Sequence, residues 1–205
     1  MELNVLQKDA LTELISIGYG RAASALSELT GYRITLEVPN IKMHSISDIL
    51  PILQRVVEGE VASVNQIFSG PIAGNALLLL DQQSALTLSR LLTDNDGQPQ
   101  GFDLSARETI TEVGNILLNA CLGVFGNLLQ VQVTFTVPRL RVEGVDSVLK
   151  SITVGSEELS HALMIHTRFQ LRASNVTGYM VVILGITSLD RMLAELDRWE
   201  QRQSS

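Results

Sequence analysis

The stretch Glu112-Val-Gly-Asn115 lies within a long amphipathic segment, and Pro138 follows its asparagine after 23 residues. An altered copy stands earlier in the chain, where Glu13 and Ser16 are three residues apart and Pro39 follows at the same 23-residue spacing. The two copies are offset by 99 residues. Repetition at a fixed offset indicates an internally duplicated fold, in which the second copy has an amide that the first lacks.

Hydrophobic periodicity places each copy on a long helix. The first helix is expected over residues 5–29, with Gly31 where a helix C-terminus favours glycine. The second is expected to begin at a capping box formed by Ser105 and Glu108 and to continue to about Leu128. Both helices are amphipathic, so each should turn one apolar side toward a core.

Strand patterns follow both helices. They predict strands at 32–40, 57–69 and 74–81, and then at 131–138, 158–170 and 177–185. Shorter helices are expected at 81–92 and 187–201, whereas 45–55 is ambiguous and compatible with a short helix broken by Pro51. Each half therefore reads helix, strand, strand, strand, helix.

These elements predict an α/β (α+β) fold with pseudo-two-fold symmetry. Hairpin-like connections favour antiparallel pairing, and two equivalent halves should merge into one sheet of about six strands with both long helices on one face. We expect a single domain, residues 1–205, made of half-repeats at about 5–92 and 103–201. A polar linker rich in Asp, Asn, Gly and Pro, residues 93–102, would join them.

Composition narrows the classes of function. A net charge of −7 and scattered Lys and Arg argue against nucleic-acid binding. The single Cys121 excludes an internal disulfide and fits a reducing compartment, and the acidic N-terminus does not resemble a secretion signal. Apolar runs such as 76–80 and 179–186 are too short to cross a bilayer. We therefore expect a cytoplasmic protein without membrane insertion.

A polar stripe runs along each long helix, opposite its apolar side. At about 100° per residue, the second helix is expected to expose together Glu108, Glu112, Asn115 and Asn119. The same positions of the first helix are Asp9, Glu13, Ser16 and Gly20.

An isolated E-x-x-N is common on the solvent side of a helix. The repeated spacing and the two mid-helix asparagines, which are mediocre helix formers, favour a functional role for Glu112 and Asn115. Glu108 is explained by helix capping and Pro138 by the end of a strand.

Other site chemistries are not indicated. The three histidines, His44, His161 and His166, are scattered and do not suggest a metal cluster. Gly18-Tyr-Gly20 lies within a helix pattern and lacks the preceding strand that a dinucleotide-binding turn requires. Metal-dependent and nucleotide-dependent classes are therefore disfavoured.

The duplicated E-x-x-N spacing before a proline, with Glu13-Leu-Ile-Ser-Ile-Gly18 and Glu112-Val-Gly-Asn115 on long helices, resembles the CheC/CheX/FliY phosphatases of bacterial chemotaxis. The likeness covers nearly the whole chain and is CheC-like, because there are two half-repeats and no appended flagellar-switch domain. It implies two long helices beside a six-stranded sheet. It also implies hydrolysis of the aspartyl phosphate of a CheY-like receiver domain.

The resemblance assigns Glu112 and Asn115 to the working site and Glu13 and Ser16 to a degenerate second site. Asp9 and Asn119 are candidates for docking support. The family usually has Asp or Ser four residues before the glutamate; Asp9 satisfies this pattern and Glu108 does not. One working site is therefore expected.

The implied chemistry requires no cofactor of this chain, because the receiver domain is expected to hold Mg²⁺. Asn115 would orient the attacking water, while Glu112 would grip a lysine of the partner. The expected partners are a phosphorylated CheY-like receiver and a CheD-like deamidase, with the chain a monomer. The alternative is a non-catalytic adaptor similar to the middle domain of flagellar switch proteins, which the missing amide at Ser16 would suit.

Overall fold

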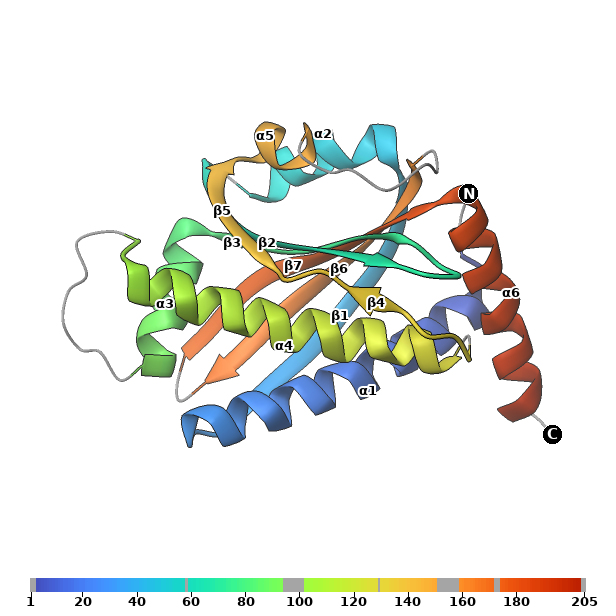
Figure 1. The fold of residues 1–205 in the computed structure, drawn as a ribbon, viewed down its shortest axis with the longest axis horizontal. Helices are drawn as coiled ribbons and strands as arrows, with labels where there is room; N and C mark the ends of the chain where they lie inside the picture. Colours follow the sequence, from blue (N-terminus) through green and yellow to red (C-terminus); the bar gives the residue numbers. More distant parts are fainter. Residues whose placement is uncertain are drawn as a thin grey trace.

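One antiparallel sheet organises the chain (Figure 1). The computed structural model describes residues 3–57, 59–93, 102–128, 130–150, 159–171 and 174–203. Within these residues the sheet has seven strands, ordered β1-β6-β7-β3-β2-β4, and β5 also pairs with β2. Because β4 and β5 are successive partners of the same strand, the sheet has six positions across its width.

The elements follow a similar order in both halves, with one more strand in the second. The first half contains α1 (Val5–Thr30), β1 (Ile34–Ser45), α2 (Ile46–Val56), β2 (Glu60–Ser69), β3 (Gly74–Asp81) and α3 (Gln82–Thr93). The second contains α4 (Leu104–Leu128), β4 (Thr134–Phe135), β5 (Arg139–Gly144), α5 (Val145–Lys150), β6 (Leu159–Leu171), β7 (Ser174–Gly185) and α6 (Ile186–Gln203). The mixed α/β fold with an antiparallel sheet is confirmed. The duplication and the half-repeat boundaries stay predictions, and 94–101 of the expected linker lie outside the described residues.

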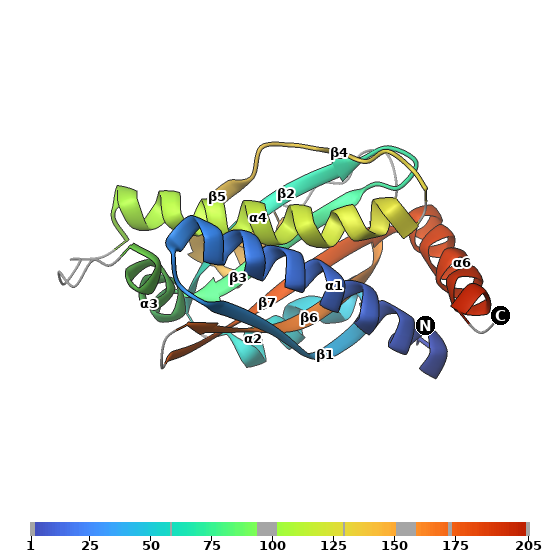
Figure 2. The ribbon, with the colours of Figure 1, turned by 90° about the horizontal axis from the view of Figure 1, so that it is seen from below.

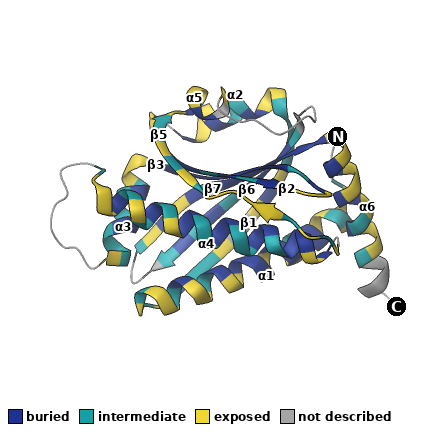
Figure 3. Ribbon diagram, in the orientation of Figure 1, coloured by how far each residue is buried: buried dark blue, intermediate teal, exposed yellow. Residues whose placement is uncertain are grey.

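Helices cover both faces of the sheet (Figure 1). The long helices α1 and α4 lie on one face and enclose the larger core, whereas the short helices α2 and α5 lie on the other. The neighbouring residues Leu78 and Leu79 of β3 point into opposite cores, as the two-residue period of a strand requires. The long helices therefore have one side in the core and the other free for contacts with solvent or a partner (Figure 3).

Side-chain caps fix where the long helices begin. Asn4 and Gln7 form a reciprocal capping box at α1, and Gly31, at φ 72°, ends that helix as expected. At α4 the expected box between Ser105 and Glu108 is wrong. Asp103 is the capping residue: its Oδ1 accepts a hydrogen bond from the Ala106 backbone N–H at 2.8 Å, so the helix begins before the serine.

The two long helices run side by side and antiparallel (Figure 2). Gly18 of α1 makes their close approach possible, because a Cβ atom there would lie 3.0 Å from the Cα of Cys121 on α4. The Cys121 side chain is fully buried at this contact, and burial raises the pKa of its thiol. The thiol is therefore protonated and shielded in the folded protein.

Several strand boundaries differ from those expected. β1 continues past Pro39 to Ser45, because it is an edge strand and its register with β6 shifts between Glu37 and Asn40. The stretch expected as one strand at 131–138 contains only the two-residue β4. β5 and α5 were not expected, and the ambiguous stretch 45–55 is the helix α2 with Pro51 inside it.

Helix α4 alone among the described helices is long and apolar enough, by length and composition, to cross a membrane. Its apolar residues Ile110, Leu117 and Cys121 are buried against the sheet and α1. Packing in the core therefore accounts for its composition.

Candidate functional site

The polar stripe of α4 is only partly exposed. Glu108 and Glu112 are exposed, but Asn115 and Asn119 are half-buried. The expectation that all four residues would be equally exposed is therefore wrong for the two asparagines. Asn119 is covered because it bonds to a side chain that rises from the sheet beneath α4.

Three amide side chains and one carboxylate form a chain of hydrogen bonds along this stripe. Asn115 Nδ2 lies 3.5 Å from Glu112 Oε2, at the outer limit of a hydrogen bond, and Asn119 Nδ2 donates to Asn115 Oδ1 at 2.7 Å. Gln66 Nε2 on β2 donates to Asn119 Oδ1 at 3.0 Å. Helical spacing of three and four residues brings the α4 side chains together, and the close packing of α4 on β2 brings in the glutamine.

Gln66 also reaches the segment between β4 and β5. Its Nε2 donates to the backbone oxygen of Thr136 at 3.1 Å. Thr136 is itself fixed to β2, because its N–H donates to the Ile67 oxygen and its hydroxyl accepts from the Ile67 N–H. The inner end of the hydrogen-bonded chain is therefore held by β2 and by the segment between β4 and β5, which is bonded to β2.

Gln66 and Thr136 were not among the residues expected from the sequence. A signal for Gln66 was present, because it is in phase with Ala62, Val64 and Phe68 on the inward side of a strand. An amide at such a position must find a buried partner. Thr136 contributes a backbone oxygen, for which sequence gives no signal.

A glycine lets α4 approach β2 closely enough for these bonds. Gly114 lies between Glu112 and Asn115, and a Cβ atom there would be 2.5 Å from Cγ1 of Val64 and 2.6 Å from its Cβ. Real Cβ atoms do not approach other heavy atoms so closely, so only glycine fits. The glycine in the motif thus sets the distance between the helix and the strand that carries Gln66.

The corresponding stripe of α1 has no such chain among the described residues. Asp9, Glu13 and Ser16 are exposed, and the Ser16 hydroxyl donates back to the Thr12 backbone oxygen at 2.7 Å. Gly20 has open space where a side chain would be. The structure therefore places the four residues on one helix side but gives Ser16 only a local bond.

Pro138 and Glu108, for which structural roles were expected, lie outside the hydrogen-bonded chain. Pro138 is half-buried and directly precedes β5, between the two partners of β2. Glu108 is exposed on α4, where Asp103 rather than Glu108 caps the helix. The proline does not end a strand as expected, because β4 already ends at Phe135, and the capping role of Glu108 is not observed.

Two histidines lie on the other side of the sheet, at a cavity of about 300 Å³. Its lining comprises Asn40, Lys42, His44, Ile52, Val56, Met164, His166 and Tyr179. Burial lowers the pKa of His44 and of His166, and nearby Lys42 and Arg168 respectively add to this effect. In the part of the chain that the structure describes, no group of three or more His, Cys, Asp or Glu residues is placed to hold a metal ion.

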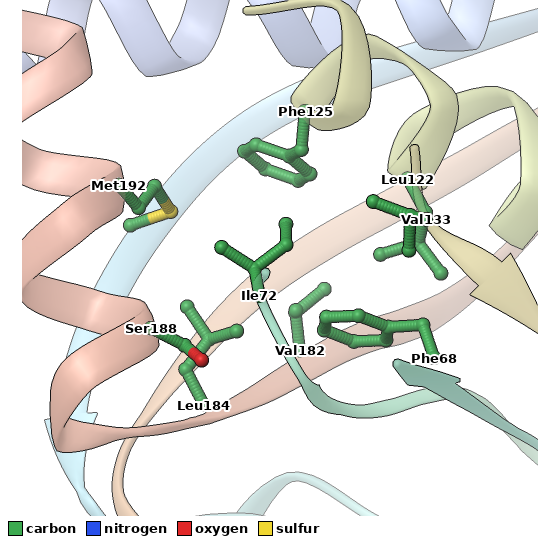
Figure 4. Close-up of a pocket in the computed structure, with 9 residues that line it drawn as sticks. All are labelled: Phe68, Ile72, Leu122, Phe125, Val133, Val182, Leu184, Ser188 and Met192. Atoms are coloured by element: carbon green, nitrogen blue, oxygen red, sulfur yellow. The ribbon is translucent and has the colours of Figure 1, made fainter. Parts of the chain in front are cut away.

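A small apolar cavity lies behind the C-terminal end of α4 (Figure 4). Phe68, Leu122, Phe125 and Met192 point toward it, and its volume is about 10 Å³. This space is no larger than a water molecule requires, so we interpret it as a packing gap between α4, α6 and the sheet. Neither this cavity nor the one beside the histidines is lined by Glu112, Asn115 or Asn119.

Taken together, the molecule has an antiparallel sheet with two long helices on one face, one of which presents an anchored asparagine and a neighbouring glutamate. No family model matches the chain. Individual relatives do match: it is 26% identical over 199 residues to the CheY-P phosphatase CheC of Bacillus subtilis, covering 93% of each chain. It is 24% identical over 148 residues to the flagellar motor switch phosphatase FliY of the same organism, covering 69% of this chain and 37% of FliY.

Solved structures show the same fold. FliY of Thermotoga maritima superposes with a TM-score of 0.76 at 17% identity, covering 97% of this chain and 99% of that chain. The FliM middle domain of H. pylori superposes with a TM-score of 0.61 at 12% identity, covering 94% and 99%. The resemblance of this chain to the CheC/CheX/FliY family is confirmed.

Proposed function

We propose that this protein hydrolyses the aspartyl phosphate of a CheY-like receiver domain. The observation that carries the proposal is the Asn115 carboxamide, held on the outer side of α4 beside the exposed carboxylate of Glu112. The names of the CheC and FliY relatives support this substrate class. Side chains on the outer side of a helix suit a protein substrate, because the partner can supply the pocket around its own phosphoryl group.

The reaction requires only a correctly placed water. The water oxygen attacks phosphorus, the bond between phosphorus and the aspartyl oxygen breaks, and the aspartate leaves as a carboxylate. The proton that the water loses passes to the phosphate product or to solvent. A carboxamide can both accept from and donate to that water, so Asn115 would align it in the way that a glutamine aligns water in GTPases.

The other groups would act in docking and charge neutralisation. Glu112 lies one turn from Asn115 and would bind a lysine of the receiver, which fixes the depth of insertion. Mg²⁺ is expected on the receiver rather than on this chain, and it would neutralise the phosphoryl oxygens. A CheD-like deamidase partner and a monomeric state stay predictions from the sequence.

The test is the decay of phosphate on a panel of purified receiver domains from the same genome, with and without this protein. Acceleration with at least one receiver is the expected result. Binding to a phosphorylated receiver without any acceleration would instead favour an adaptor. That second function has support of its own, because the fold also matches the FliM middle domain and Ser16 replaces an amide.

Ser16→Asn is expected to add activity at α1. If α1 gains a working site equal to that of α4, the activity per chain rises by about twofold. Gly20 stands where α4 has Asn119, so the new amide has no neighbour to hold it and the single variant should gain less than Ser16→Asn/Gly20→Asn.

Both variants and Gly20→Asn alone would be compared in the receiver assay at equal receiver occupancy. Equal activity for the double variant and the unmodified protein would mean that the surface around α1 no longer admits a receiver. A Cβ atom at Gly20 meets no heavy atom within 4 Å, which argues against a steric explanation of that result.

A further inference from the structure

The hydrogen bonds that end at Asn115 form an amide relay, which consists of Gln66, Asn119 and Asn115. Each amide can face its neighbour with either its oxygen or its NH₂ group, and the two atoms have nearly the same shape. Which atom faces outward at Asn115 decides what that side chain can do to a water. If the relay serves the site, it must therefore have a defined polarity, which means that its three amides donate hydrogen bonds in one fixed direction.

The two ends of the relay define that polarity. At the inner end the Thr136 backbone oxygen is only an acceptor, so Gln66 must turn its NH₂ group toward it. The same NH₂ group also reaches Asn119, which must therefore present its oxygen to Gln66 and its NH₂ group to Asn115. Asn115 is then obliged to present its oxygen inward.

The outer end agrees with this assignment. Asn115 Nδ2 is left on the side of Glu112, whose ionised carboxylate is also only an acceptor. Reversing any one amide would place two donors or two acceptors face to face. The bonds that remain free on Asn115 are one lone pair of Oδ1 and one N–H of Nδ2, which match the donor and acceptor capacities of one water.

Burial of Gln66 also lowers the stability of the folded protein. Its side chain is only 1% exposed, and its Oε1 has no hydrogen-bond partner among the described residues. An unpaired buried carbonyl lowers the stability of the folded state. Its apolar in-phase neighbours show that an apolar side chain would suit this position for packing alone.

Beneath α1 the sheet holds a different group. The buried hydroxyl of Thr167 on β6 hydrogen-bonds with the Tyr19 hydroxyl on α1, next to Gly20. The sheet thus anchors each long helix through a buried polar contact, but among the described residues only α4 is anchored through an amide that leads to the motif. The relay is therefore specific to the helix that has the complete Glu and Asn pair.

We infer that Gln66 and Asn119 are positioning residues that fix the orientation of the Asn115 carboxamide, an inference that rests on the proposed function. They act through Asn115 and do not touch the phosphoryl group. Loss of the relay should therefore lower the rate of the chemical step and leave receiver docking largely unchanged.

Asn119→Asp tests the polarity directly. The aspartate can still accept from Gln66, but its carboxylate cannot donate to Asn115, so Asn115 should turn its NH₂ group inward. We expect kcat to fall about tenfold at pH 8 while KM stays within about twofold, because one oriented hydrogen bond is lost. Asn127→Asp adds the same charge at an exposed position of the same helix and should leave both constants unchanged.

The pH dependence separates positioning from damage to the fold. An aspartate has a pKa near 4 in water, and partial burial at this position should raise it. As the pH falls toward that pKa, the carboxyl group gains a proton and can again donate to Asn115. The ratio of unmodified to variant kcat should therefore decrease from pH 8 toward pH 5, whereas a merely unstable variant would show no such recovery.

Side-chain amide NMR gives a readout that does not depend on activity. The Gln66 and Asn119 NH₂ signals should be protected from exchange in the unmodified protein. The Asn115 NH₂ signals should shift in Asn119→Asp but not in Asn127→Asp. A kcat ratio near one at every pH, or unshifted Asn115 signals, would overturn the inference. If no receiver is dephosphorylated by the unmodified protein, the proposed function fails, and the NMR result still decides whether the relay orients Asn115.

Discussion

Replacing Asn115 by alanine is expected to lower the stimulated rate of receiver dephosphorylation by about 100-fold or more, because removal of one positioned group in a preorganised site has effects of this size. The side chain is half-buried and bonded only through its amide to Glu112 and Asn119. Alanine removes a carboxamide that can both accept a hydrogen bond from a water and donate one to it. Receiver phosphate decay under single-turnover conditions measures the effect.

The fold should tolerate this change. Alanine is a better helix former than asparagine, by up to about 0.7 kcal/mol, so stability should be unchanged or slightly higher. Asn127→Ala, at an exposed position of the same helix, is the matched control for helix propensity and should retain full activity. An unchanged rate in Asn115→Ala would reject the proposed mechanism, whereas loss of receiver binding would assign the asparagine to docking.

Gly114→Ala is expected to have the largest effect on stability. Two contributions oppose each other: alanine in place of glycine favours a helix by about 1 kcal/mol, but the new Cβ would lie 2.5–2.8 Å from three side-chain atoms of Val64. One of those atoms is the Cβ of Val64, which cannot move without the backbone of β2. Overpacking of this kind typically costs 1–3 kcal/mol and can cost more, so we expect a net loss of about 2 kcal/mol in the free energy of unfolding.

The same change should reduce activity, because α4 can relieve the contact only by moving away from β2. That movement separates Asn119 from Gln66, which lies two residues from Val64 on the same strand. Gly123→Ala on the same helix is the control, since a Cβ there meets nothing within 4 Å. Urea unfolding should show this control to be more stable by about 0.5–1 kcal/mol. Destabilisation of both variants to the same extent would contradict the role assigned to Val64.

The long helices and their outward residues could be predicted from sequence, because a 25-residue pattern with a 3.6-residue period is difficult to produce in another way. Gly31 was recognised for a local reason that needs no tertiary context. By contrast, β5 was not expected, because its apolar residues Leu140 and Val142 are only half-buried at one edge of the sheet. α5 is also short, and periodicity is weak over six residues.

The site also has residues that could be predicted from the sequence and residues that could not. Glu112 and Asn115 could be proposed from spacing along one helix, whereas their connection to Gln66 depends on how closely α4 approaches β2. That approach is set by Gly114, whose packing against Val64 is a contact between residues 50 positions apart. Spacing along the chain predicts which residues share a helix side, but it does not predict the strand residue that lies beneath them.

The contact of Gly18 with Cys121 places a thiol where its reactivity reports on the separation of α1 and α4. The chain contains one cysteine, and its thiol is buried where α1 meets α4. A thiol reagent can reach it only when α1 and α4 separate. The labelling rate in native buffer therefore measures how often these two helices separate. Receiver docking on α4 could then be followed, without introducing another cysteine, as a change in the labelling rate of this thiol.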